Sequence, residues 1–217
     1  MQFYNRAEAG KALGERLTGY ANRPEVLILA LQGGGIPIAS EVSRMLNVPA
    51  DILVVRKLRL PEESDIVIGA ITSGKVQVLN DTIVHDLELT PSRLETIVEQ
   101  AEVELAAKEQ KFRGARPFSE LEGRTVIVVD DGLGTGSSMR VALEAIKQRK
   151  PGRIVIALPV APPSVYYDFQ SLADEIVCLF TPADFGAVRN YYTEFLPVTE
   201  EETQKLLALT AQKVAKV

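Results

Sequence analysis

The sequence predicts an α/β fold: a single domain over residues 1–217, built on a doubly wound, mostly parallel five-stranded sheet, with a small subdomain that contains a β-hairpin. Apolar runs such as VLILAL (26–31) are continuous rather than alternating, as in strands that are buried on both faces. Segments of helical period separate most of these runs at short spacing, which favours βαβ units. The chain has 217 residues, of which 46% are hydrophobic, so it can bury one sizeable core.

The first half of the chain predicts a βαβ unit and then a hairpin. The expected elements are a helix over 6–20, a strand over 26–31, a helix over 36–47 and a strand over 51–55. Residues 66–79 then alternate around Ser73 and Gly74, which is typical of a β-hairpin and interrupts the parallel pattern.

The second half opens with a long helix and then resumes the alternation of strands and helices. Thr90 and Pro91 predict the start of a helix that runs to about Phe112, with Gly114 beyond its end. Thr199, with Glu202 three residues later, predicts the cap of a last helix. The remaining expected elements are strands over 125–129, 153–160 and 175–180, and helices over 136–148, 163–173 and 199–214.

The composition disfavours several classes of protein. Lys and Arg number 24 against 29 Asp and Glu, and the formal net charge of -5 argues against a broad nucleic-acid surface. The apolar runs fall far short of the ~18 residues that a membrane span needs. Cys178 is the single cysteine, so no intramolecular disulfide is possible, and its apolar neighbours indicate a small core residue rather than a nucleophile. We therefore expect a cytoplasmic protein that binds neither nucleic acid nor membrane.

Three loops follow strands at the carboxyl edge of the expected sheet, which is where open parallel sheets bind their ligands. They are QGGG (32–35), RKLRLP (56–61) and DDGLGTGSS (130–138). The third leads directly into a helix, so its N–H groups and the helix N-terminus form a nest for a phosphate, with hydroxyl groups as further donors. The residues of this phosphate loop are Gly132, Leu133, Gly134, Thr135, Gly136, Ser137 and Ser138.

Asp130 and Asp131 stand immediately before the phosphate loop, where their charges would repel a phosphate. Carboxylates are, however, good acceptors for neutral hydroxyl groups. Two acids beside a phosphate nest therefore predict a sugar phosphate, ribose 5-phosphate, whose hydroxyls lie against the end of the strand.

The stretch VIVVDDGLGTGSS (126–138) resembles the phosphoribosyl-pyrophosphate signature of the type I phosphoribosyltransferases, with four apolar residues, two acids and a Thr-Gly-x-Ser/Thr loop. LQGGGIPIASEV, DILVVRKLRLP, VIGAITSG, RIVIALPVAPP and VCLFTPADFGAV resemble a branch of this family whose substrate is unassigned. The resemblance implies that phosphoribose passes from phosphoribosyl pyrophosphate to a nitrogen acceptor such as a nucleobase. Pyrophosphate would be released, and Mg2+ would be the cofactor.

The resemblance also implies roles for individual residues, with a mobile loop over 57–66 that excludes water. A hood over 60–120 and 181–198 would cover the acceptor. The protein ligands of the metal are unknown, and the apolar face of the helix over 90–112 could serve a homodimer or the core. The resemblance implies that Asp130 and Asp131 bind the ribose hydroxyls and that the loop from Thr135 to Ser138 binds the 5-phosphate. It also implies that the pyrophosphate lies against Gln32, Gly33, Gly34 and Gly35, and that Arg56 and Lys57 stabilise its charge as it leaves.

Two other functions remain open. Gly33 stands where that branch carries a basic residue, which leaves open a non-catalytic protein that binds phosphoribosyl pyrophosphate or a nucleotide and regulates a partner. Gly132 and Gly134 replace an apolar and a small residue of the signature, which predicts a more flexible phosphate loop. A sugar phosphohydrolase, which releases inorganic phosphate without an acceptor, is the weaker third possibility.

Several of these residues also have a purely structural interpretation. The glycines over 33–35 could form only a tight turn, and the cations over 56–59, which include Arg59, could be a solvated cluster. His85 favours a surface or capping role, because no second ligand lies nearby. Packing is favoured over base stacking for four tyrosines, Tyr166, Tyr167, Tyr191 and Tyr192.

Overall fold

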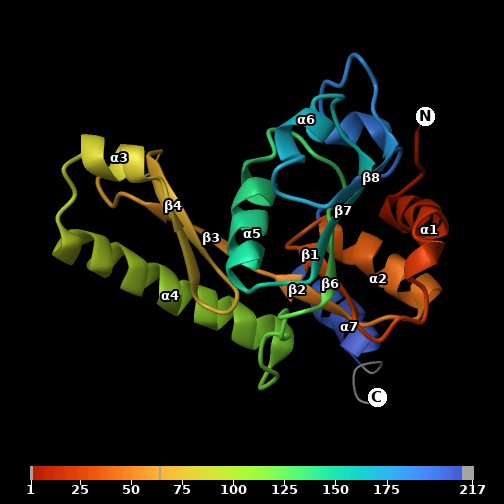
Figure 1. Cartoon of the computed structure of the whole chain (residues 1–217), viewed down its shortest axis with the longest axis horizontal. Helices are drawn as coiled ribbons and strands as arrows, with labels where there is room; N and C mark the ends of the chain where they lie inside the picture. The colour runs from red at the N-terminus through yellow and green to blue at the C-terminus, as the bar shows by residue number, and fades with distance from the viewer. Residues whose placement is uncertain (1, 64, 212–217) are drawn as a thin grey trace.

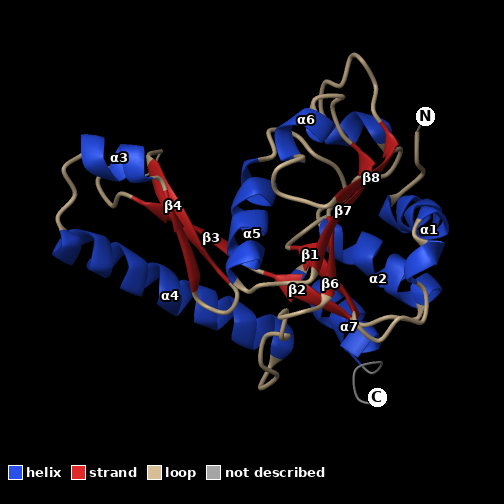
Figure 2. Ribbon diagram, viewed as in Figure 1, coloured by secondary structure: helices blue, strands red, loops and turns tan. Residues whose placement is uncertain are grey.

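The computed structural model describes residues 2–63 and 65–211, and within them the chain forms two β-sheets (Figures 1 and 2). The larger sheet is parallel throughout, with strand order β2-β1-β6-β7-β8. This confirms the predicted α/β fold and its five-stranded sheet. The strands are β1 (Val26–Leu31), β2 (Ala50–Leu53), β6 (Thr125–Val129), β7 (Arg153–Val160) and β8 (Glu175–Phe180).

Helices cover both faces of the parallel sheet, because alternate residues of each strand point to opposite sides. Ile28 of β1 belongs to a core shared with α1 and α2, whereas its neighbour Leu29 belongs to a core shared with α5 and α6. The helices are α1 (Arg6–Arg16), α2 (Gly35–Leu46), α5 (Ser137–Gln148), α6 (Val165–Phe169) and α7 (Glu200–Ala211), with 3-10 turns η1 (Thr18–Tyr20) and η2 (Val188–Tyr191).

The second sheet forms an outer lobe beside α5, at the left of Figure 1. Its antiparallel strands are β3 (Val55–Arg59), β4 (Val67–Thr72) and β5 (Val76–Leu79), of which β4 and β5 are the predicted hairpin. Two helices complete the lobe, α3 (Asp81–Asp86) and α4 (Pro91–Arg113). The buried side chains of α4, such as Ile97 and Leu105, join the core that includes Leu58 of β3. The apolar face of α4 is therefore covered by this chain itself.

A single residue, Val54, connects the two sheets. Its carbonyl oxygen accepts a hydrogen bond from Ser73 N at 2.9 Å, and its N–H donates to Ser73 Oγ at 3.0 Å. Arg113, at the end of α4, reaches the same place: its Nε lies 2.8 Å from Asp51 Oδ1, and it also donates to the Ile52 carbonyl. A buried polar network thus joins β2, the hairpin turn and α4.

Some element bounds differ from the predicted ones. The single strand expected over 51–55 is two strands in different sheets, and residues 56–59 of the expected RKLRLP loop belong to β3. The first helix ends at Arg16, where Leu17 N bonds back to Gly14 O and tightens the last turn. The helix expected over 163–173 is only α6, and α3 has no counterpart among the expected elements. Glu202 N donates to Thr199 Oγ1 at 3.1 Å, which confirms that cap, while residues 212–214 of the expected helix lie outside the described ranges.

The residues over 181–198 lie beside the N-terminus rather than in the outer lobe. Phe3 forms an isolated bridge with Tyr192, and Glu194 N donates to Tyr4 O at 2.7 Å. The two predicted parts of the hood therefore occupy different places in the fold, and their joint action on an acceptor stays a prediction.

Candidate functional site

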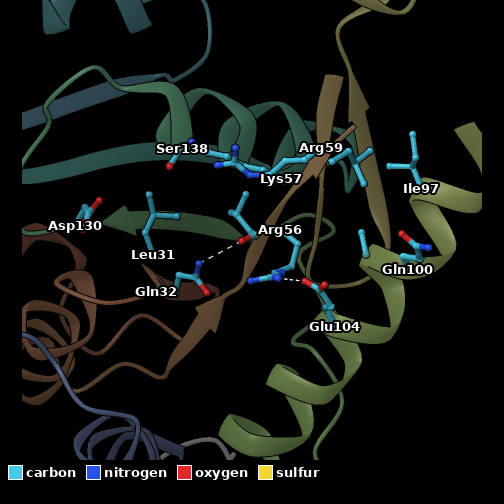
Figure 3. Close-up of a pocket in the computed structure, with 13 residues that line it drawn as sticks. Leu31, Gln32, Arg56, Lys57, Arg59, Ile97, Gln100, Glu104, Asp130 and Ser138 are labelled. Atoms are coloured by element: carbon cyan, nitrogen blue, oxygen red, sulfur yellow. Dashed lines mark hydrogen bonds and ion pairs between the residues drawn. The ribbon is translucent and has the colours of Figure 1, made fainter. Parts of the chain in front are cut away.

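A cavity of about 470 Å³ opens between the carboxyl edge of the parallel sheet and the outer lobe (Figure 3). Ala30 pairs with both Ile52 and Val129, so β1, β2 and β6 end at the same edge. The cavity receives residues from all three predicted loops and from the inner face of α4. Its polar lining residues are Gln32, Arg56, Lys57, Arg59, Gln100, Glu104, Asp130 and Ser138.

The two predicted acids follow β6 and face different partners. Asp130 lines the cavity, and its Oδ1 accepts a hydrogen bond from Asp131 N at 2.9 Å. Asp131 Oδ2 lies 2.7 Å from Arg6 Nε in an ion pair whose two side chains are 13% and 12% exposed. One acid is thus open to a ligand, and the other is held by a cation from α1.

Burial controls the protonation of both acids. Desolvation, followed by repulsion from Asp131, raises the pKa of Asp130 to about 8. Desolvation also raises the pKa of Asp131, and the hydrogen bond from Arg6 opposes this rise. Both acids are therefore harder to ionise than ordinary aspartates, and a cation brought close to them favours their charged forms.

The glycine loop after β1 packs directly on the acid pair. A methyl group on Gly34 would lie 1.8 Å from Asp131 Oδ2, and one on Gly35 would lie 2.7 Å from the Val129 carbonyl oxygen. Gly33 has a φ of +93°, the left-handed region that favours glycine, and its missing side chain faces open space. The loop thus makes a tight turn and packs closely against the acids. Its backbone at Gly33 is exposed and accessible to a ligand.

The phosphate loop is anchored at its start and open at its end. Gly132 is buried, and a methyl group there would lie 2.7 Å from Val188 Cγ1; Leu133 N donates to Val160 O at 3.0 Å. Close packing, rather than flexibility, explains the glycine at 132. Gly134 has no neighbour within 4 Å of its missing side chain.

The exposed end of this loop leads into α5. Thr135 and Ser137 are exposed, with their hydroxyl oxygens 3.4 Å apart. Gly136, with a φ of +73°, precedes the helix and provides no side-chain cap, so no side chain at that position occupies the first N–H groups of α5. This arrangement suits an anion at the start of α5.

The predicted cations lie on β3, not in a loop, and point to the cavity (Figure 3). Arg56 forms an ion pair with Glu104 of α4. Gln32 Nε2 donates to Val55 O at 3.2 Å, which ties the first loop to β3, while Gln32 Oε1 is buried and has no hydrogen-bond partner among the residues described. Arg56 and Lys57 therefore belong to a built cavity wall as well as to a charged surface.

Three contributors to this region carry no signal in the sequence. Arg6 reaches Asp131 across 125 positions, and Glu104 and Gln100 reach the cavity from α4. No local motif marks these residues, because each acts through a contact between distant segments.

Other candidate residues lie away from the cavity lining. The His85 side chain is 90% exposed, in keeping with a surface role. Tyr192 is buried and Tyr191 stacks on Phe185 at 5.5 Å, so these two tyrosines pack as expected, whereas Tyr166 and Tyr167 are exposed. Cys178 is only half-buried, and burial raises the pKa of its thiol to about 11, which disfavours a nucleophile.

Residues 2–63 and 65–211 lack two further features. They hold no group of three or more His, Cys, Asp or Glu side chains placed to bind a metal ion. Among the helices described, none combines the length and the apolar character needed to cross a bilayer.

Comparison with known proteins connects this geometry to a family. The family model described as "Phosphoribosyl transferase domain" matches residues 3–189. Two Mycobacterium tuberculosis proteins, from strains CDC 1551 and H37Rv and each named a putative phosphoribosyl transferase, are 35% identical over 205 residues, which are 94% of this chain and 46% of each relative. The chain thus spans about half the length of these relatives. The crystal structure of TT1426 from Thermus thermophilus is 35% identical, has a TM-score of 0.82 and is matched over 97% of this chain and 100% of its own.

Proposed function

Because the chain belongs to the phosphoribosyl transferase family, we propose that it transfers phosphoribose from phosphoribosyl pyrophosphate to a nitrogen acceptor, such as a nucleobase, with Mg2+ and with release of pyrophosphate. The observation that carries the proposal is one cavity that receives residues from three segments: Gln32 from the loop after β1, Asp130 and Ser138 from the loop after β6, and the cations Arg56 and Lys57 from β3. Each segment supplies the chemistry that one part of the donor needs.

The acid pair and the phosphate loop account for the ribose 5-phosphate half of the donor. Asp130 and Asp131 offer carboxylate oxygens to the ribose hydroxyls. The start of α5, with Thr135 and Ser137, offers N–H and hydroxyl donors to the 5-phosphate.

The cations account for the leaving group. The bond between the anomeric carbon and the pyrophosphate oxygen breaks, the acceptor nitrogen bonds to the opposite face of that carbon, and the acceptor loses a proton. Positive charge develops on the ribose ring and negative charge on pyrophosphate. Arg56 and Lys57 on β3, together with the backbone at Gly33, stabilise the departing pyrophosphate.

The residues present fit a magnesium ion that arrives with the donor. Mg2+ usually keeps several waters and binds through substrate phosphates rather than through a cage of protein side chains. Gln32 Oε1, a buried acceptor without a partner among those residues, is suited to a water of that ion. The ion supplies further charge stabilisation to pyrophosphate.

Calorimetric titration tests the donor site. We expect phosphoribosyl pyrophosphate to bind the protein more tightly with Mg2+ than without it, and more tightly than ribose 5-phosphate or pyrophosphate alone. The double variant Asp130→Asn, Asp131→Asn should lose this binding, whereas Lys111→Gln, which removes an exposed cation paired with Glu200, should not. An unchanged affinity in the double variant would refute the assignment of the acids.

Turnover tests the reaction class. Pyrophosphate release that requires a nucleobase or another nitrogen acceptor supports the transferase. Donor binding without release, over a screen of acceptors, would instead support the regulatory alternative, which stays open because position 33 is a glycine where the related branch carries a basic residue. Release of inorganic phosphate without an acceptor would identify a phosphohydrolase.

A further inference from the structure

Arg6 is the cation that contacts the second acid, and three contacts fix its guanidinium. Its Nε lies 2.7 Å from Asp131 Oδ2, and its Nη1 donates to Leu196 O at 2.6 Å. The guanidinium carbon lies 3.9 Å from the centre of the Phe195 ring, within the range of a cation–π contact. The guanidinium of Arg6 is thus fixed by a carboxylate, a backbone carbonyl and an aromatic ring before any ligand is bound.

The backbone of Asp131 is fixed from the same segment. The hydroxyl of Tyr192, a residue that is 4% exposed, donates to Asp131 O at 2.6 Å. The Tyr192 ring packs against Phe3 and Phe195, with centroids 5.7 Å and 5.2 Å away. The end of β6 is therefore clamped by the N-terminal helix and by the segment that follows β8.

The charge of Arg6 matters because two acids stand side by side. The groups that face Asp131 are Asp130 on its own loop, Arg6 from α1 and Tyr192 from the segment after β8. Burial favours the neutral form of both acids, and Arg6 is the cation that favours their charged forms. A neutral carboxyl is a poorer acceptor for a hydroxyl than a carboxylate is.

We propose that Arg6 is a positioning residue of the donor site: its guanidinium holds Oδ2 of Asp131 and so orients the carboxylate, which leaves Oδ1 as the oxygen that meets the sugar. This inference rests on the proposed binding of a ribose by the acid pair. It assigns a role in ligand binding to the N-terminal helix, which contributes no residue to the lining of the cavity.

The experiment measures binding of phosphoribosyl pyrophosphate with Mg2+ from pH 6 to pH 9 by calorimetry. Arg6→Gln should bind several-fold more weakly than the wild type at pH 7, because a smaller fraction of the desolvated Asp131 carboxyl is charged once the cation is removed. The ratio of the two affinities should return toward one by pH 9. Arg44→Gln is the matched control, because Arg44 forms an exposed ion pair with Glu41 on α2, and it should bind as the wild type does.

Carbon-13 NMR of the aspartate carboxyls gives a readout that needs no ligand, with Asp131 assigned by its loss in Asp131→Asn. Arg6→Gln should raise the midpoint of the Asp131 titration, because the hydrogen bond and charge of Arg6 then no longer oppose the effect of burial. Arg6→Lys should leave that midpoint close to the wild-type value and bind the donor several-fold more weakly, since a lysine cannot reproduce the fork. Arg6→Lys also serves as the test if Arg6→Gln does not fold.

The outcomes separate the two proposals. Failure of the wild type to bind the donor would overturn the proposed function. Normal binding by the wild type with unchanged binding by Arg6→Gln, or with a loss that is equal at every pH, would overturn the role of Arg6 alone. If only Arg6→Lys folds, a wild-type affinity in that variant would overturn it as well.

Discussion

A methyl group on Gly34 would lie 1.8 Å from Asp131 Oδ2, so the loop after β1 and the acids after β6 fit together only because one of them has no side chain. The contact joins two segments that are almost a hundred positions apart and makes them one surface. The position of Asp131 therefore depends on Gly34 as well as on Arg6.

Gly34→Ala should displace Asp131 and separate it from Arg6. We expect donor affinity to fall by at least tenfold and the free energy of unfolding to fall by about 1–3 kcal/mol, as for other overpacked sites. Calorimetry and urea denaturation measure the two effects. Gly19→Ala is the control, since nothing lies within 4 Å of the added methyl group. Wild-type donor affinity in Gly34→Ala would contradict the close contact.

Asp130→Asn should be more stable than the wild type, and the difference in the free energy of unfolding should grow as the pH rises from 4 to 8. The pKa of Asp130 is raised from its ordinary value of 3.8 to about 8, so the folded state holds a proton that the unfolded state has lost between these values. The free energy of unfolding therefore falls as the pH rises from about 4 to about 8, and the penalty for ionising the buried carboxyl is complete above pH 8. The variant should melt at a higher temperature than the wild type at pH 8, and the difference should shrink toward pH 4.

Thermal melting from pH 4 to pH 9 checks this prediction. Asp86→Asn is the control, because the Asp86 side chain is 69% exposed and is not desolvated. A wild-type melting profile in Asp130→Asn would show that burial does not hold a proton on Asp130.

Glu104→Gln should strengthen the binding of pyrophosphate. Glu104 pairs with Arg56 in the cavity wall, and a phosphate must compete with this carboxylate for the guanidinium. The pair is partly exposed, so we expect a gain of about twofold to fivefold, equivalent to about 0.5–1 kcal/mol. Calorimetry at low and high salt measures it, and the gain should shrink at high salt.

Glu99→Gln is the control for that experiment, because it removes the same charge from an exposed position of α4. Equal effects of the two variants would mean that net charge, rather than the pair with Arg56, governs the affinity.

Arg113→Gln should strongly destabilise the protein. The Arg113 side chain is 2% exposed and pairs with Asp51, whose side chain is 6% exposed, so the variant leaves a buried carboxylate without its cation. We expect a loss of about 3–5 kcal/mol in the free energy of unfolding. Lys111→Gln, at an exposed pair on the same helix, should cost at most about 1 kcal/mol. Urea denaturation compares them, and similar losses would refute the importance of the network.

The parallel sheet could be predicted because its strands are continuous apolar runs, a signal that each strand carries in its own sequence. The boundary between β2 and β3 could not, because DILVVRKLR contains no turn residue. The break arises where Ser73, 19 positions later, bonds to both backbone groups of Val54.

In the candidate site, too, local segments could be predicted from the sequence and contacts between distant segments could not. The glycine loop, the acids and the phosphate loop are short segments, and their chemistry can be interpreted locally. Arg6 and Glu104 act through contacts that only the folded chain creates, and neither lies in a motif. The sequence predicts flexibility at Gly132, and this is wrong, because Val188, which fills the space beside it, is distant in sequence.

The outer lobe is fixed to the parallel sheet at one end, where Val54 connects β2 to β3. Hydrogen bonds from Ser73 and the buried Arg113 hold that end, while α4, 23 residues or about 35 Å long, extends from it toward α3. Displacement grows with distance from a pivot, so any tilt of the lobe about this end would move α3 more than Arg113.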